Sequence, residues 1–152
     1  MAETKVLIKS AIVGASVLLI DKFIHNNYAN PETSYYFIFK FFLGFILAYY
    51  LFENKDRIYG VNLNPLDFKK GSGSYYICWS VGFAALHGLY YRILEFFQGN
   101  DFFSRVGDIN IFGFTFEGNI FMLALGWLLV HGLAFYAGIL IANQLDRMKV
   151  IS

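Results

Sequence analysis

The stretch GFAALHGLYY, residues 82–91, lies inside an apolar run, and its pattern returns 44 positions later as GWLLVHGLAF, residues 126–135. Each copy contains a glycine, an aromatic residue and the tripeptide His-Gly-Leu. Both runs are long enough to cross a bilayer, because about 20 helical residues at about 1.5 Å each match a hydrocarbon core of about 30 Å. The two copies therefore predict two transmembrane helices, each with a polar ring near the bilayer midplane.

Four apolar runs have this length, and we expect transmembrane helices over residues 6–24, 35–52, 75–97 and 120–142. The apolar content of 57% and the charged content of 15% are typical of a chain whose solvent is mostly lipid. Short connections make successive helices antiparallel neighbours. We therefore predict an all-α integral membrane protein in which residues 1–152 form a single domain, an antiparallel four-helix transmembrane bundle.

The distribution of basic residues predicts the orientation of these helices. With an even number of spans, both termini and the connection 53–74 share one side. That side carries eight basic residues: Lys5, Lys9, Lys55, Arg57, Lys69, Lys70, Arg147 and Lys149. The opposite connections carry Lys22 and Arg105. Because cytoplasmic loops are enriched in Lys and Arg, we expect a multi-pass protein of the plasma membrane with both termini and the connection 53–74 in the cytoplasm.

The two connections after the second and third helices have different characters. The cytoplasmic loop 53–74 is polar and closes with Gly-Ser-Gly-Ser, which favours a flexible segment. The outer loop 98–119 alternates apolar with polar or small residues around Gly113, which favours a hairpin or an extended segment on the membrane surface. Its aromatic residues suit interfacial anchoring, and a docking surface for another protein is the alternative.

His87 and His131 are expected to meet, since both lie near the middle of antiparallel helices. Three interpretations stay open. The first is a structural hydrogen bond that joins the helices. The second is a ligand pair for haem b or a copper ion. The third is a path for protons or a substrate, in which His87, Tyr91 and Glu95 follow one another at four-residue spacing along one helix face.

Small residues on two helices predict close packing. Trp127 and His131 share a helix face with Ala134, Gly138 and Ala142, whose four-residue spacing lets a second helix approach closely. Gly14 belongs to a similar cluster on the first helix. These stripes could pack within the chain, or between two copies of it in a homo-oligomer.

Four charged residues are expected near the outer interface: Asp21, Lys22, Lys40 and Arg92. Long side chains at this depth usually reach the interface or form ion pairs. We interpret the cluster in this way, with a binding site for an anion or a lipid headgroup as the alternative.

Several classes of function are excluded or disfavoured by the residues. A net charge of +1 provides no basic field for nucleic acid. The single cysteine, Cys78, cannot form an internal disulfide and is interpreted as a small apolar filler. No metalloprotease, serine-hydrolase or phosphate-loop motif occurs in the sequence. Catalysis is left open by these observations, but they favour a chain without catalytic activity of its own.

The resulting hypothesis is an accessory or structural subunit of a larger integral-membrane complex, such as a respiratory or metal-dependent oxidoreductase assembly. Its expected partners are the lipid bilayer and other membrane subunits. Two alternatives follow from the histidines: a redox carrier that binds haem or copper through both of them, and a small channel or transporter with the polar path described above.

Overall fold

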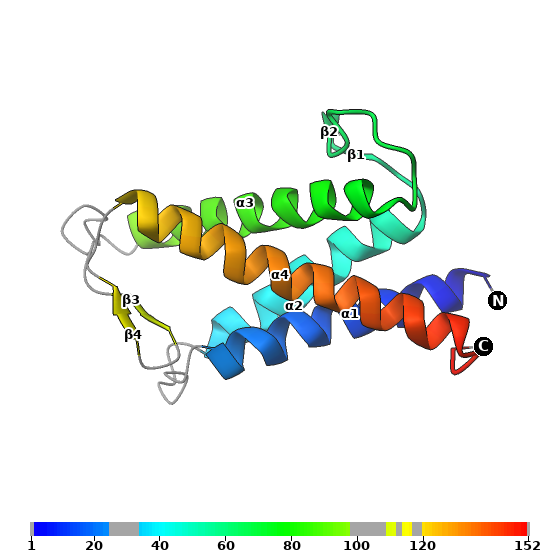
Figure 1. The fold of residues 1–152 in the computed structure, drawn as a ribbon, viewed down its shortest axis with the longest axis horizontal. Coiled ribbons are helices and arrows are strands. Elements are labelled where there is room, and N and C mark those ends of the chain that lie inside the picture. Colours follow the sequence, from blue (N-terminus) through cyan, green and yellow to red (C-terminus); the bar gives the residue numbers. More distant parts are fainter. Residues whose placement is uncertain (1, 25–33, 98–108, 112–113, 117–119, 152) are drawn as a thin grey trace.

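Four helices and two β-hairpins follow one another along the chain in the computed structural model, which describes residues 2–24, 34–97, 109–111, 114–116 and 120–151 (Figure 1). The helices are α1 (Ala2–Ile24), α2 (Ser34–Phe52), α3 (Gly73–Phe97) and α4 (Ile120–Arg147). The strands are β1 (Arg57–Ile58), β2 (Val61–Asn62), β3 (Ile109–Ile111) and β4 (Phe114–Phe116). Each predicted helix is present, and α1 and α4 extend beyond the expected bounds at the chain ends.

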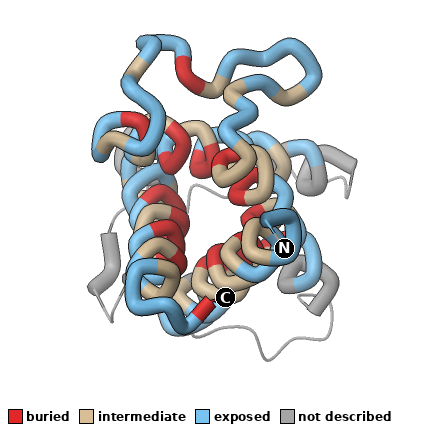
Figure 2. The backbone as a smooth tube through the Cα atoms, turned by 90° about the vertical axis from the view of Figure 1, so that its right-hand side faces the viewer, coloured by how far each residue is buried: buried red, intermediate tan, exposed pale blue. Residues whose placement is uncertain are grey.

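The helices pack in the order α2, α1, α4, α3, so that α1 and α4 form the centre and α2 touches α3 only slightly. Buried residues lie on the helix sides that face one another, and exposed residues lie on the outside (Figure 2). Both termini lie at the same end of the molecule, and β3 and β4 lie at the other end (Figure 1). The connection 53–74 lies on the same end as the termini, as the sequence predicted.

Close approach of α1 to both neighbours depends on small residues. A Cβ atom added at Gly14 would lie 2.7 Å from the carbonyl oxygen of Phe41 on α2. On the other side, a Cβ atom at Gly138 would lie 3.1 Å from the Cα atom of Val13. The small-residue stripe of α4 therefore packs within the chain against α1, and the stripe is not free to join two copies of the protein.

An ion-pair cluster joins the first and last helices where the termini meet. The Asp146 carboxylate accepts hydrogen bonds from the ammonium groups of Lys5 and Lys9, the second at 3.4 Å. The Lys9 ammonium also lies 4.2 Å from the centre of the Phe52 ring on α2. One short cluster thus connects α1, α2 and α4 at this end.

The connection between α2 and α3 is more ordered than the sequence predicted. β1 and β2 pair antiparallel, with Arg57 opposite Asn62. Tyr59 and Gly60, at φ values of 48° and 82°, form the two-residue turn between them. At the Gly-Ser-Gly-Ser end, the Ser72 hydroxyl accepts a hydrogen bond from the Tyr75 amide at 3.2 Å and caps α3. The expected flexible end is therefore a capped helix start.

The hairpin expected in the outer connection is present. β3 pairs antiparallel with β4, and Ile109 lies opposite Phe116 while Ile111 lies opposite Phe114. The alternation of apolar with polar or small residues in this segment predicted the pairing. The rest of the connection lies outside the described residues.

One described helical segment is long and apolar enough to cross a membrane: the 24 residues Ala124–Arg147 of α4. The apolar part of α2, Ile38–Phe52, is shorter. In α3, Ser80 and His87 interrupt the apolar sequence. Four helices are thus confirmed with one candidate span among them, while crossings by the other three helices stay a prediction.

Candidate functional site

His87 on α3 and His131 on α4 stack against each other between the two helices. Their ring centres lie 4.0 Å apart, and their planes are inclined by 20°. Both side chains are buried, with exposed fractions of 0% and 1%. The expected contact between the two imidazoles is therefore present, and it is a face-to-face stack.

A second stack lies next to the first along the same helix interface. The rings of Phe83 and Phe135 lie 4.5 Å apart and are nearly parallel, at 11°. Phe83 precedes His87 by four residues and Phe135 follows His131 by four, which is the register of two antiparallel helices. Because the helices run antiparallel, histidine packs against histidine and phenylalanine against phenylalanine across the interface.

Trp127 completes the histidine layer. Its indole Nε1 donates a hydrogen bond to Nδ1 of His87 over 3.3 Å, and its ring lies 4.8 Å from the ring of His131. Because an indole N–H is only a donor, Nδ1 of His87 accepts, and the proton of its neutral imidazole lies on Nε2. Sequence reasoning placed Trp127 on the face of His131 but gave it no role, since its partner lies on another helix.

The stacked geometry does not fit a metal held between the two histidines. A metal-to-nitrogen bond is about 2.0 Å long, so two imidazoles on opposite sides of one iron have ring centres about 6 Å apart. The separation here is 4.0 Å, and parallel stacked rings do not direct their nitrogens at one point. Among the described residues, no group of three or more His, Cys, Asp or Glu side chains could hold a metal ion. The side chains as placed therefore do not fit the haem or copper expected as an alternative.

The other candidate residues are described only in part. The side chains of Tyr91 and Glu95, expected to continue the polar path, lie outside the described residues, and so do those of Asp21 and Arg92 in the charged cluster. The polar path and the full charged cluster stay predictions.

Lys22 and Lys40 differ in their surroundings. Lys22 is exposed, as expected for an interfacial side chain. Lys40 is 4% exposed and lies on the inner side of α2. A lysine that reaches the interface keeps its ammonium in water, whereas the Lys40 side chain is packed inside the structure. The ion pair with Asp21 that the sequence allows stays a prediction, since the Asp21 side chain lies outside the described residues. Four-residue spacing places Lys40 on the helix face of Gly44 and Ala48, which packs inward.

Comparison with protein-family models, with curated proteins and with solved structures finds no match to this chain.

Proposed function

We propose that this protein is an accessory or structural subunit of a larger integral-membrane complex. In this proposal all four helices cross the plasma membrane, and both termini lie in the cytoplasm. The observation that carries it is the His87–His131 stack with its Trp127 donor. The polar groups in the middle of α3 and α4 are buried in a joint between helices, where they stabilise packing.

The outer surface of α4 supports a location among lipids or other membrane subunits. Leu125, Leu129 and Leu133 are exposed at four-residue spacing, with exposed fractions of 52%, 54% and 63%. A continuous exposed apolar stripe is unfavourable in water but suits the hydrocarbon core or another hydrophobic helix.

The arrangement of charges supports the orientation. The eight basic residues counted above belong to the two termini and to the connection 53–74, which share one end of the molecule (Figure 1). Such an excess is typical of the cytoplasmic side.

The test is purification of the tagged protein from its native membranes in a mild detergent. We expect stoichiometric partner chains to accompany it. Recovery of the protein as a monomer or as a homo-oligomer would contradict the proposal. A matched pair of variants, Leu129→Ala on α4 and Phe42→Ala on α2, removes one exposed apolar side chain from each of two faces. If one of these faces contacts a partner chain, its variant should be purified without that chain. The variant on the other face should keep the partner and serves as the control.

The same preparation tests the oxidoreductase character of the parent complex. For an oxidoreductase assembly, we expect the visible absorption spectrum of the complex to show haem. The partner chains should retain this haem after this protein is removed. Haem that stays with this chain alone would contradict a purely structural role.

A further inference from the structure

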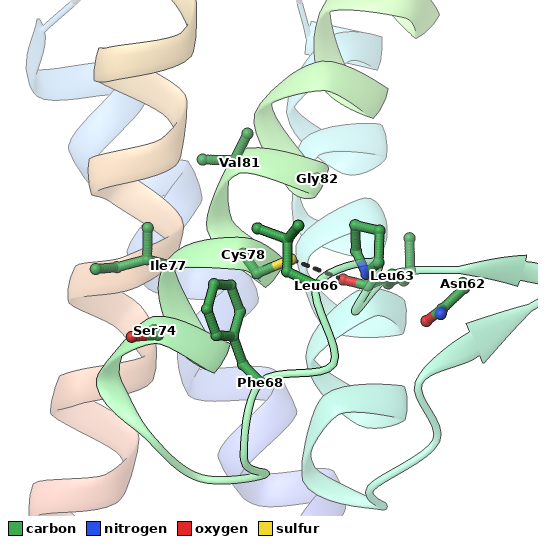
Figure 3. A pocket seen from close by; sticks show the side chains of 10 residues that line it. Asn62, Leu63, Leu66, Phe68, Ser74, Ile77, Cys78, Val81 and Gly82 are labelled. Atoms are coloured by element: carbon green, nitrogen blue, oxygen red, sulfur yellow. Dashed lines mark hydrogen bonds between the residues drawn. The ribbon is translucent and has the colours of Figure 1, made fainter.

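A cavity of about 530 Å³ lies between the first turns of α3 and the chain that follows β2 (Figure 3). It lies at the end of the molecule that carries the termini, and its volume is within the range of about 300 to 1,000 Å³ usual for ligand sites. Most of its lining is apolar: Asn62, Leu63, Pro65, Leu66, Phe68, Ser74, Ile77, Cys78, Val81 and Gly82.

Hydrogen bonds hold the outer wall of this cavity in place. The buried amide of Asn64 donates to the carbonyl oxygen of Phe68 and accepts from its N–H, each over 2.9 Å. The thiol of Cys78 on α3 donates to the carbonyl oxygen of Leu63 over 3.1 Å. These hydrogen bonds hold the segment after β2 both to itself and to α3. The cavity is therefore formed without a ligand.

The cavity opens onto the outer apolar surface of α3. Leu66, Ile77 and Val81 line it and are nevertheless exposed, with exposed fractions of 70%, 54% and 53%. From there an exposed apolar stripe continues along the helix at four-residue spacing: Ile77, Val81, Ala85, Leu89 and Ile93. A long apolar ligand can thus extend from the cavity along the helix.

Two basic residues lie next to lining residues of the cavity. Arg57 is paired opposite Asn62, which lines the cavity, and Lys69 directly follows Phe68, another lining residue. Both are exposed and have no ion pair in the part of the chain that the structure describes. Asp67 is the acidic neighbour, whereas Asp56 already pairs with Lys70 over 3.3 Å.

We propose that this cavity binds one acyl chain of an anionic phospholipid, with its headgroup beside Arg57 and Lys69. The apolar cavity and the stripe on α3 receive the hydrocarbon, and the two cations attract the phosphate at the cytoplasmic surface. This inference rests on the membrane location in the proposed function but not on the subunit role.

The experiment uses the purified full chain in phosphatidylcholine vesicles that contain a fraction of phosphatidylglycerol with a photoreactive acyl chain. Labelled peptides are mapped by mass spectrometry. We expect labelling of residues 62–68 to saturate as the probe fraction rises, because a site has limited capacity. Labelling of the exposed face of α4 at Leu129 and Leu133 should rise in proportion to the probe, as it does for bulk lipid.

Filling the cavity provides the matched variants. A Cβ atom at Gly82 would lie 4.0 Å from Leu63 Cδ2, so Gly82→Leu places a side chain in the cavity, and Val81→Phe narrows it from the same helix. Gly126→Leu is the control, since nothing lies within 4 Å of a Cβ atom there among the described residues. Gly82→Leu should weaken labelling of residues 62–68 about fifteenfold, because displacing each of about two methylenes weakens affinity about fourfold. Gly126→Leu should leave it unchanged.

The headgroup is tested with Lys69→Gln, which should raise the half-saturating fraction of phosphatidylglycerol about fivefold. A phosphatidylcholine probe should saturate the site only at a higher fraction. Labelling without saturation, labelling unaffected by both cavity-filling variants, or equal saturation by the two lipids would overturn the proposal. Because the assay contains no other protein, its result is independent of whether partner chains are found in native membranes.

Discussion

The imidazole rings of His87 and His131 stack 4.0 Å apart in the buried interface between α3 and α4, one layer away from a stack of two phenylalanines. Both rings are buried, and each forms part of the other's packing surface. The two histidines should therefore contribute to stability as a pair.

Removal of either ring tests this coupling. His87→Ala and His131→Ala should each lower the free energy of unfolding by about 2 to 4 kcal/mol, because each leaves a cavity in a close-packed interface. The double variant should lose less than the sum, with a coupling of about 0.5 to 3 kcal/mol. Reversible unfolding in detergent measures these values. The control His131→Phe keeps a flat ring and should retain most of the stability, whereas additive losses would contradict a paired role.

Trp127→Phe tests the hydrogen bond to His87. The variant keeps an aromatic ring but removes the donor, so Nδ1 of His87 loses its partner at 3.3 Å. We expect a loss of stability of about 1 kcal/mol, at the lower end for a buried polar atom because the bond is long. Nitrogen NMR of the wild-type protein should show the proton on Nε2 of His87. A proton on Nδ1 of His87 would exclude the hydrogen bond from Trp127 to this atom.

Gly14→Ala tests the close approach of α1 to α2. Alanine favours helices over glycine by about 1 kcal/mol, but its Cβ atom would lie 2.7 Å from a backbone oxygen of Phe41. The steric effect should prevail, and we expect a net loss of about 1 to 3 kcal/mol. The same substitution at Gly126, where a Cβ atom meets nothing among the described residues, should be neutral or stabilising. Thermal unfolding of both variants makes the comparison, and equal effects would contradict the packing.

The orientation in the membrane is tested by labelling single cysteines in intact cells. In a Cys78→Ala background, Tyr59→Cys lies in the fully exposed turn between β1 and β2, and Arg105→Cys lies in the predicted outer connection. A membrane-impermeant maleimide should label position 105 in intact cells and position 59 only after permeabilisation. Labelling of both positions in intact cells would rule out the four-span arrangement.

The dependence of stability on pH has one identifiable contribution at the end of α2. The Glu53 carboxylate accepts hydrogen bonds from the Lys55 ammonium at 2.8 Å and the Tyr49 hydroxyl at 3.1 Å. These partners, Lys55 first, hold the pKa of Glu53 below its ordinary value. The folded pKa is lower than the unfolded value of about 4.3, so the stabilisation is complete above that pH and is lost as pH falls through the folded pKa.

Glu53→Gln should therefore be less stable than the wild type near pH 7, and the difference should shrink as pH falls to about 3. Thermal unfolding midpoints at a series of pH values measure it. Asp67→Asn, at an exposed acid without an ion pair in the described residues, is the control for the loss of one surface carboxylate. A constant difference across this pH range would rule out the ion pair as its source.

Local patterns in the sequence determined much of the architecture. The four apolar runs predicted four helices, and alternation around Gly113 predicted the β3–β4 hairpin. The β1–β2 hairpin was missed because Tyr59 fills a turn position that Asn or Asp usually occupies. A two-residue hairpin turn can be recognised in a sequence only when its positions carry the residues that such turns usually contain.

By itself, the sequence determined which helices form, how they alternate in direction and that His87 and His131 face one interface, because these follow from hydrophobic length and helical periodicity. Tertiary structure alone decided that the imidazoles stack, that Trp127 donates to one of them and that Lys40 is buried. It alone formed the cavity between α3 and the chain after β2. These features depend on the distance and rotation between segments far apart in the chain, which side-chain packing sets and periodicity does not specify.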